Sequence, residues 1–263
     1  MRAAICTALA ACTAACTTNQ TPQPEPAPML PSCVPNRDGV IASTELPIAL
    51  GATLTYYVST NQTIAQQGER WDFSVERAED DIVALGPVAL KEQWYASSFP
   101  TGAFVVDAGS GLDGIYHQDD QALWLDGTAS HDSAMVSRTL IVYPQPIAVL
   151  RFPVTAGDAY MTRATLAGAT INGLPFNGSD EVSVSVVGAG LLAVPYVEMS
   201  PVLRVTVGVV RMPSTGPSTS RRTTLFLFEC FGEVARAESK PDEPSADFTF
   251  AAYFRRFALG VTP

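Results

Sequence analysis

The stretch EVSVSVV, residues 181–187, decides the fold class of this chain. Val182, Val184 and Val186 alternate with polar residues, and a strand places alternate side chains on opposite faces of a sheet. Valine is also among the residues that strands favour. The stretch therefore predicts a strand with one buried face and one solvent-facing face, which is typical of an antiparallel sheet.

The same alternation continues through most of the chain after Glu45, and Gly, Pro, Asn or Asp interrupts it about every 8 to 12 residues. This spacing is typical of short antiparallel strands joined by turns. No stretch shows a convincing long amphipathic helix. The clearest predicted strands cover residues 53–58, 71–77, 102–107, 135–143, 181–187, 202–212 and 222–229.

The C-terminal stretch ADFTFAAYFRRFAL, residues 246–259, fits two patterns. Tyr253 and Phe257 continue a helical spacing, whereas Phe248 and Ala252 continue the spacing of a strand. We predict a final strand. With the earlier runs it predicts an all-β fold: a single antiparallel β-domain over residues 33–263, built as a curved sheet, a half-barrel or a sandwich.

One internal similarity suggests two related β-halves. LPIALGATLTYY, residues 46–57, is echoed 106 residues later by FPVTAGDAYMTR, with one proline and one glycine of each stretch in register. In each stretch the glycine, Gly51 or Gly157, permits a tight turn before a strand. A match of this length also arises by chance, so duplication stays an alternative. Its halves would cover residues 45–143 and 147–258.

The first 15 residues, MRAAICTALAACTAA, predict a lipoprotein signal peptide, because a basic residue precedes a short run of small apolar residues. That run is too short to span a membrane. Leu-Ala-Ala-Cys ending at Cys12 resembles the bacterial lipobox better than Thr-Ala-Ala-Cys ending at Cys16 does. Cleavage at Cys12 would leave a signal of only 11 residues and an unpaired Cys16. We therefore predict lipidation of Cys16, with Cys12 as the alternative; an ordinary cleaved signal peptide stays open.

Residues 16–32 predict a tether that begins at the lipidated cysteine. TTNQTPQPEPAPMLPS, residues 17–32, holds five prolines and no apolar periodicity. In polyproline II it would reach about 50 Å. Thr17 follows Cys16, and the resemblance to enterobacterial lipoproteins then implies retention in the outer membrane. The expected partner is thus a membrane, reached through the lipid anchor.

The charge balance excludes nucleic acid as a partner. The chain has 16 basic and 26 acidic residues, a net charge of −10, and only two lysines, Lys91 and Lys240. Binding to a phosphate backbone needs clustered Lys and Arg.

Processing at Cys16 leaves Cys33 and Cys230 as an even pair of cysteines in an oxidising compartment. Cys33 follows the proline-rich tether, and Cys230 ends an apolar run before a glycine turn. We predict a disulfide between them, which would pin the tether to a late strand. The alternative is two separate thiols, with Cys230 buried in the sheet.

The stretch FVVDAGSGLDGIYH, residues 104–117, contains fragments of two enzyme motifs but completes neither. Gly109, Gly111 and Gly114 have the dinucleotide-binding spacing, which requires a following helix. The residues that follow predict a hairpin instead. Asp107 precedes Ala-Gly-Ser, but the alanine lacks the hydroxyl that braces the loop of aspartic proteases, and no second copy exists. We expect a glycine-rich loop.

The two histidines, His117 and His131, lie near Asp119, Asp120 and Asp132, and such residues can hold zinc or iron. A metal-dependent hydrolase is therefore an alternative. Each histidine also lies beside a predicted turn of an acidic protein, where His and Asp commonly face solvent. We predict no metal site, no cofactor, no catalytic residues and no enzymatic activity.

An apolar-Pro-apolar-x-x-Gly opening, followed by GIYHQDDQALWLDG, LRFPVTAGDAY and LFLFECFGEVARAES, resembles a broad group of uncharacterised bacterial envelope lipoproteins. That group is similar in turn to the curved sheets of the LolA and LolB lipoprotein carriers. The chain departs from it at residues 231–235, Phe-Gly-Glu-Val-Ala. The resemblance implies architecture and location, and no catalytic motif.

The leading hypothesis is therefore a non-enzymatic envelope lipoprotein, anchored in the outer membrane, that acts as a binding or structural module. The chain has 12 Phe, 8 Tyr and 3 Trp, which suffice for a β core. A curved sheet lined by such residues could also hold an acyl chain. The alternative is thus a periplasmic carrier or chaperone of a lipid or another apolar ligand, and the partner could equally be an envelope protein.

Overall fold

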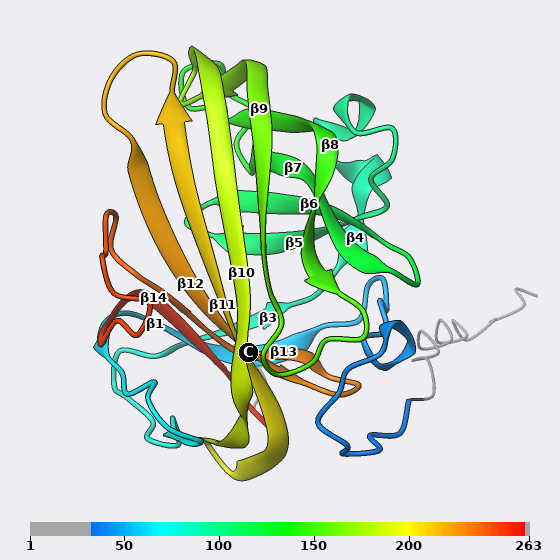
Figure 1. Ribbon diagram of the computed structural model, residues 1–263, viewed down its shortest axis with the longest axis vertical. Helices are drawn as coiled ribbons and strands as arrows, with labels where there is room; N and C mark the ends of the chain where they lie inside the picture. The colour runs from blue at the N-terminus through cyan, green and yellow to red at the C-terminus, as the bar shows by residue number, and fades with distance from the viewer. Residues whose placement is uncertain (1–32, 261–263) are drawn as a thin grey trace, which may run out of the picture.

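A computed structural model describes residues 33–260, which form one curved, antiparallel sheet of 14 strands that is not closed (Figure 1). The prediction of an all-β fold is confirmed. Between residues 33 and 260 the helical elements are three short 3₁₀ helices, η1 (Ser43–Glu45), η2 (Leu90–Glu92) and η3 (Ala96–Ser98), and no helix there is long and apolar enough to cross a membrane. The strands are β1 (Leu54–Thr63), β2 (Arg70–Asp72), β3 (Asp81–Leu85), β4 (Val88–Ala89), β5 (Phe104–Gly109), β6 (Leu112–Gln118), β7 (Ala122–Ser130), β8 (Leu140–Arg151), β9 (Ala159–Ile171), β10 (Leu174–Val194), β11 (Val197–Pro213), β12 (Thr219–Phe228), β13 (Gly232–Glu238) and β14 (Phe250–Phe257).

The order of the strands brings the two ends of the sheet close together. It runs β3-β1-β14-β13-β12-β11-β10-β9-β8-β7-β6-β5-β4, and β2 pairs in parallel with β10. The two edge strands, β3 and β4, are consecutive in the chain and are joined only by Gly86 and Pro87. Gly86 is needed there, because a Cβ atom would lie 2.0 Å from the carbonyl oxygen of Ala52. The sheet therefore wraps around its own interior.

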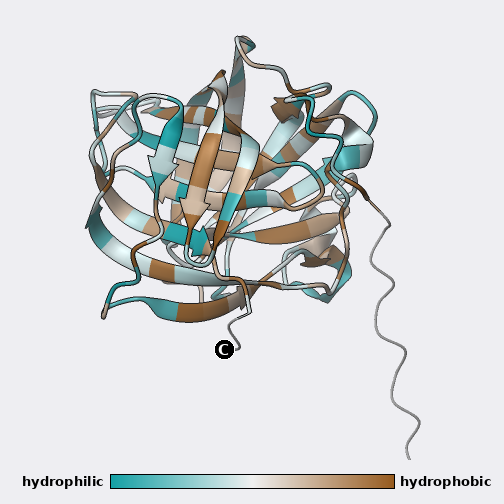
Figure 2. Ribbon diagram, turned by 90° about the horizontal axis from the view of Figure 1, so that it is seen from below, coloured by the Kyte–Doolittle hydropathy of each residue, from teal (hydrophilic) through white to brown (hydrophobic). Residues whose placement is uncertain are grey.

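The alternating stretch at residues 181–187 lies in the middle of β10, which pairs with β9 on one side and β11 on the other. Val182, Val184 and Val186 are buried, whereas Ser183 and Ser185 are exposed. Figure 2 shows the same alternation of hydrophobic and hydrophilic residues along the strands. The periodicity thus predicted both the strand and its buried face.

Most of the predicted strands are confirmed, but two are wrong over part of their length. The strand predicted at 71–77 ends at Asp72, whose carboxylate accepts hydrogen bonds from the N–H and hydroxyl groups of Ser74. The strand predicted at 135–143 begins only at Leu140. Asp132 accepts hydrogen bonds from the N–H of Ala134 and the hydroxyl of Ser137, and so holds the preceding residues in a turn.

The ambiguous C-terminal stretch forms strand β14, as predicted. It pairs with β13 and with β1, so the last strand of the chain lies beside the first long one. Phe254 is fully buried there and contacts Phe73 edge to face, with ring centroids 4.9 Å apart. Tertiary pairing with strands on both sides thus decides an apolar pattern that local sequence leaves open.

Two large cores lie on opposite faces of the sheet. The valines of β10 belong to an interior core with Ile141, Ile147 and Val205. On the other face an aromatic cluster contains Trp71, Phe73, Phe226 and Phe254. Residues 64–75 cover that face over β12–β14, since Trp71 and Phe73 contact Phe226 with ring centroids 5.1 and 5.2 Å away. A third, smaller cluster joins η2 and η3 to β5 and β6.

The repeated openings share local geometry. Gly51 and Gly157 both have positive φ, 79° and 95°, and each lies shortly before a strand, β1 or β9. β8 runs through residues 144–146, between the two proposed halves. The division into related halves 45–143 and 147–258 stays a prediction.

Candidate functional site

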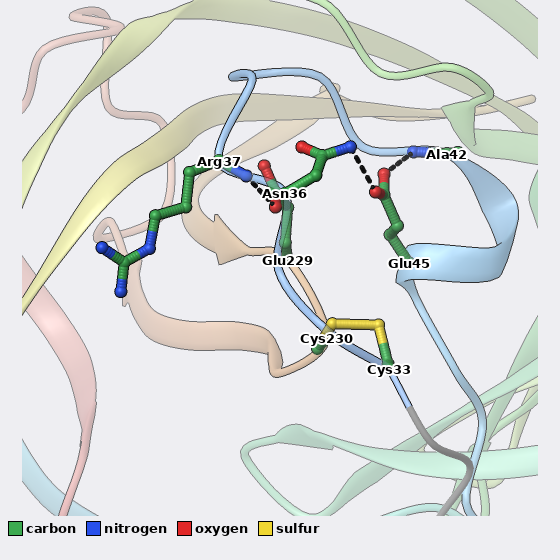
Figure 3. The surroundings of a disulfide bond; sticks show 7 residues. All are labelled: Cys33, Asn36, Arg37, Ala42, Glu45, Glu229 and Cys230. Atoms are coloured by element: carbon green, nitrogen blue, oxygen red, sulfur yellow. Dashed lines mark hydrogen bonds between the residues drawn. A yellow bond between two sulfur atoms is a disulfide. The ribbon is translucent and has the colours of Figure 1, made fainter.

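The site with the clearest chemistry is where the N-terminal segment joins the sheet. Cys33 and Cys230 form a disulfide with Cα atoms 5.5 Å apart, and the bond links residues 197 positions apart in the sequence (Figure 3). This Cα–Cα distance lies within the usual range for disulfides. The predicted bond is thus present, and it joins the first described residue to the turn between β12 and β13.

Hydrogen bonds around the disulfide hold the same segment (Figure 3). Glu229, which is 1% exposed, accepts a 2.7 Å hydrogen bond from the main-chain N–H of Arg37. The main-chain N–H of Cys230 donates to the carbonyl oxygen of Glu45 at 2.8 Å. The Glu45 carboxylate accepts from the Asn36 side chain and from the main-chain N–H of residue 42. We call residues 33–46, with Glu229 and Cys230, the N-terminal clamp.

The clamp also reaches strands on the far side of the interior. Ile41 forms an isolated bridge with Val154, just before β9. The side chain of Gln118, at the end of β6, donates to the main-chain carbonyls of Ser43 and Leu46 at 3.1 and 3.2 Å. Residues 33–46 therefore contact β6, the approach to β9 and the β12–β13 turn.

The residues predicted to precede the clamp lie outside the described part of the chain. These are the signal peptide over 1–15, the lipidated cysteine at Cys16 or Cys12, and the tether over 16–32. Their assignments remain predictions.

The glycine-rich stretch at 104–117 forms the hairpin of β5 and β6, as predicted, and no helix follows it. Gly109, Ser110 and Gly111 have positive φ, between 55° and 84°, which explains the glycines. Asp107 accepts a 2.6 Å hydrogen bond from the N–H of Gly109, so its carboxylate holds the turn. The hairpin lacks the helix N-terminus that would bind a pyrophosphate.

This hairpin rests on charged groups that sequence analysis did not single out. Arg236 donates to the carbonyl oxygen of Ala108 at 3.1 Å, and Arg255 donates to that of Asp107 at 3.3 Å. Both guanidinium groups also bind the Glu233 carboxylate, at 2.9 and 2.5 Å. Glu238 lies 3.5 Å from Arg236 and 3.6 Å from Arg221. We call Glu233, Arg236, Glu238 and Arg255 the ion cluster.

Burial and pairing act in opposite directions within the ion cluster. Burial alone would raise the pKa of Glu233, but the charges of Arg236 and Arg255 outweigh it, and the pKa is lowered. At Glu238 burial outweighs the neighbouring arginines, and the pKa is raised. The cluster joins β13 and β14 to the β5–β6 hairpin across the interior of the sheet.

The two histidines do not share a site. His117 Nδ1 lies 2.7 Å from a carboxylate oxygen of Asp126, near the Trp124 end of the β6–β7 hairpin. His131 Nε2 lies 3.0 Å from Asp113, and its main-chain N–H donates to Gly111 at the other end. Each pair includes an aspartate that the sequence analysis did not select.

The selected aspartates have other roles. Asp119 accepts hydrogen bonds from the main-chain N–H groups of Gln121 and Ala122 in the β6–β7 turn, and Asp132 holds the turn before β8. In the part of the chain that the structure describes, no three His, Cys, Asp or Glu residues are grouped so that they could hold a metal ion.

No protein-family model matches this chain, and neither a curated protein nor a solved structure matches it. The resemblance to envelope lipoproteins and to LolA and LolB stays a prediction.

Proposed function

We propose that this chain is an exported lipoprotein of the cell envelope, anchored in the outer membrane through Cys16, or alternatively Cys12. It acts as a non-enzymatic binding or structural module. The observation that carries the proposal is the disulfide between Cys33 and Cys230. Disulfides persist in oxidising compartments and are rare in the cytosol.

The position of the bond supports the anchor as well as the export. Cys33 directly follows the proline-rich residues 17–32, so the bond stands where a tether would enter the domain. The N-terminal clamp attaches the segment that follows Cys33 to three parts of the sheet. Such an arrangement suits a domain that is held by one end of its chain.

The anchor is tested with the full chain in a bacterial host that makes lipoproteins. Metabolic labelling with an alkyne analogue of palmitate, together with membrane fractionation, should label the wild type and place it in the outer membrane. Cys16→Ser should abolish both signals, whereas Cys12→Ser, the matched control, should keep both. The reverse pattern assigns the lipid to Cys12. A wild-type chain that takes no label overturns the anchor.

The non-enzymatic part has its own test. Asp107, the best candidate carboxylate in the glycine-rich hairpin, holds a main-chain turn, and His117 is held by Asp126. We therefore expect no turnover in a panel of ester, peptide and glycoside substrates. A measured turnover that Asp107→Asn or His117→Gln removes would contradict this part of the proposal.

A further inference from the structure

The sheet has a gap between its two ends. β4 pairs with β5, but β3, which lies two residues earlier in the chain, pairs among the described strands only with β1. A pocket of about 190 Å³ lies in this gap, and its lining includes Val58, Val83, Leu85, Asp107 and Tyr253. We call it the gap pocket. Sites for drug-sized ligands measure about 300 to 1,000 Å³, so the gap pocket fits one long side chain better than such a ligand.

One edge of β3 is unpaired. β1 occupies the other edge of residues 81–85, and the described part of the chain forms no further main-chain hydrogen bond with these five residues. Proteins commonly protect such an edge with lysine, proline or a β-bulge. β3 reads Asp-Ile-Val-Ala-Leu and pairs with β1 without a register shift, so it carries none of these. Its free edge therefore offers N–H and C=O groups to an added strand.

A strand added to this edge would direct side chains towards the gap pocket. Val83 and Leu85 line the pocket, so the face of β3 that carries alternate residues 81, 83 and 85 is the pocket side. Alternate side chains of the added strand would point to the same side. There the aliphatic part of a side chain would contact Val58, Val83 and Leu85, and its burial would be favourable.

The polar group of the gap pocket is a carboxylate without a basic partner. The Asp107 carboxylate accepts a hydrogen bond from the N–H of Gly109, and no ion pair joins it to a basic side chain of residues 33–260. Arg255 donates to the carbonyl oxygen of Asp107, but its own ion pair is with Glu233. A cationic group that enters the pocket would thus form a charge-assisted hydrogen bond with Asp107.

The approach to the free edge is also acidic. ERAEDD, residues 76–81, has four carboxylates and one arginine, and it ends at the first residue of β3. Arg256 pairs with Asp80, whereas Glu76 and Glu79 accept hydrogen bonds from the neutral side chains of Tyr57 and Gln62. The whole chain carries a net charge of −10. These charges favour a basic partner over an acidic one.

The same charge and the short length of the edge disfavour a second copy of this chain as the partner. Five residues span about 17 Å, and one pair of such strands buries much less than the 1,200 to 2,000 Å² of a typical stable interface. Two copies would also bring two net charges of −10 together. A short basic peptide avoids both costs.

We propose that the free edge of β3 binds an extended, lysine-containing peptide by strand addition. The peptide main chain bonds to residues 81–85, one lysine lays its aliphatic stem against Val83 and Leu85, and its ammonium group binds the Asp107 carboxylate. This partner rests on the proposed function as a binding module, but the edge belongs to the folded domain, so it does not depend on the lipid anchor.

The test uses the full chain carrying Cys12→Ser and Cys16→Ser, so that a failure of the anchor leaves the result unaffected. Fluorescence anisotropy with labelled Thr-Val-Thr-Lys-Thr-Val-Thr, blocked at both ends, should show saturable binding with one site. Norleucine in place of the lysine keeps the stem without the charge and should weaken binding about ten-fold. Methylation of every main-chain nitrogen should abolish binding, because it removes the donors to β3. Absence of saturable binding, or equal affinities for the three peptides, overturns the proposal.

One pair of variants places the lysine. Asp107→Asn keeps a side-chain oxygen for the N–H of Gly109 and should lower the affinity for the lysine peptide to that for the norleucine peptide. Asp132→Asn, the matched control, makes the same charge change at a turn carboxylate outside the gap pocket and should change affinity less than about two-fold. Equal effects of the two variants would refute the role of Asp107.

Hydrogen exchange followed by mass spectrometry places the main chain of the peptide. Bound peptide should slow exchange over residues 81–85 and leave residues 219–228, in β12, unchanged. Unchanged exchange over residues 81–85 would contradict strand addition. Exchange there that slows with rising protein concentration, without peptide, would assign the edge to a second copy and overturn the proposal.

Discussion

The N-terminal clamp and the ion cluster both join distant parts of the chain, but they do so through different kinds of interaction. The clamp uses a covalent bond and hydrogen bonds at the end of the domain, such as that between Arg37 and Glu229, 192 residues apart. The ion cluster uses buried charges, and its arginines reach carbonyl oxygens 128 and 148 residues away. We therefore expect the stability of the clamp to depend on redox conditions and that of the ion cluster to depend on pH.

The clamp and the ion cluster also fix different parts of the molecule. The clamp fixes residues 33–46, which are not part of a long strand, whereas the ion cluster fixes β13 and β14 against the β5–β6 hairpin. Loss of the clamp should loosen residues 33–46, whereas the strands of the sheet should stay folded. Loss of the ion cluster should destabilise the sheet itself.

The largest effect is expected from Arg255→Met. It leaves the buried Glu233 carboxylate with Arg236 alone and removes the bond to the β5–β6 hairpin. Removal of one partner of a buried ion pair costs about 3 to 5 kcal/mol of the free energy of unfolding. Denaturant unfolding followed by circular dichroism measures it.

Arg70→Met is the matched control for this prediction. Arg70 pairs with Glu198 at 2.8 Å, but both side chains are more than half exposed, and such pairs contribute about 0 to 1 kcal/mol. If Arg255→Met costs no more than Arg70→Met, the ion cluster does not hold the two ends of the sheet together.

A smaller effect is expected when Cys33 and Cys230 are both replaced by serine. The enclosed loop of 197 residues gives an upper figure of about 5 kcal/mol, and a compact unfolded chain reduces this to about 2 to 4 kcal/mol. The strand signal in circular dichroism should persist under native conditions. Limited proteolysis should now cut within residues 33–46, because the clamp keeps only its hydrogen bonds. Proteolysis that opens the sheet strands first would contradict the division between the two regions.

The smallest effect concerns pH. Burial raises the pKa of Glu238 in the folded state, so the folded protein binds more protons than the unfolded chain between the two pKa values. This group therefore adds stability as pH falls from neutrality towards about 4.3, its ordinary value. Glu238→Gln should remove that gain, so its stability relative to the wild type should be more favourable at pH 7 than at pH 5.

Thermal unfolding of both proteins at the two pH values measures this shift, with Glu198→Gln as a control on an exposed carboxylate. Measurements stay at or above pH 5, because the lowered pKa of Glu233 makes its own contribution to stability disappear only at lower pH. A difference that is constant with pH, or larger at pH 5, would show that burial does not dominate at Glu238.

Sequence analysis predicted the features that depend on local pattern. Alternation gave the strand at residues 181–187 and its buried valines, and cysteine chemistry gave the bond between Cys33 and Cys230. It failed where side-chain hydrogen bonds end a strand early, as at Asp72, or delay its start, as after Asp132. Asp72 and Asp132 both accept such hydrogen bonds, and the predicted strands around them are shorter than expected.

The ion cluster escaped prediction for a different reason. Arg236 and Glu238 alternate with alanines in FGEVARAES, and this pattern normally places the charged residues in solvent. The sheet wraps so far that this polar face turns inward and meets the β5–β6 hairpin. That contact depends on the curvature of the whole sheet, which no local pattern contains.

The most direct test of the proposed function is mass spectrometry of the mature protein from the membrane fraction, without reduction. We predict an N-terminal peptide that begins at Cys16, or at Cys12, and carries a diacylglycerol, together with a linked pair of peptides containing Cys33 and Cys230. An unmodified N-terminus at another residue, with both cysteines recovered as free thiols, would contradict the proposal of a tethered envelope module.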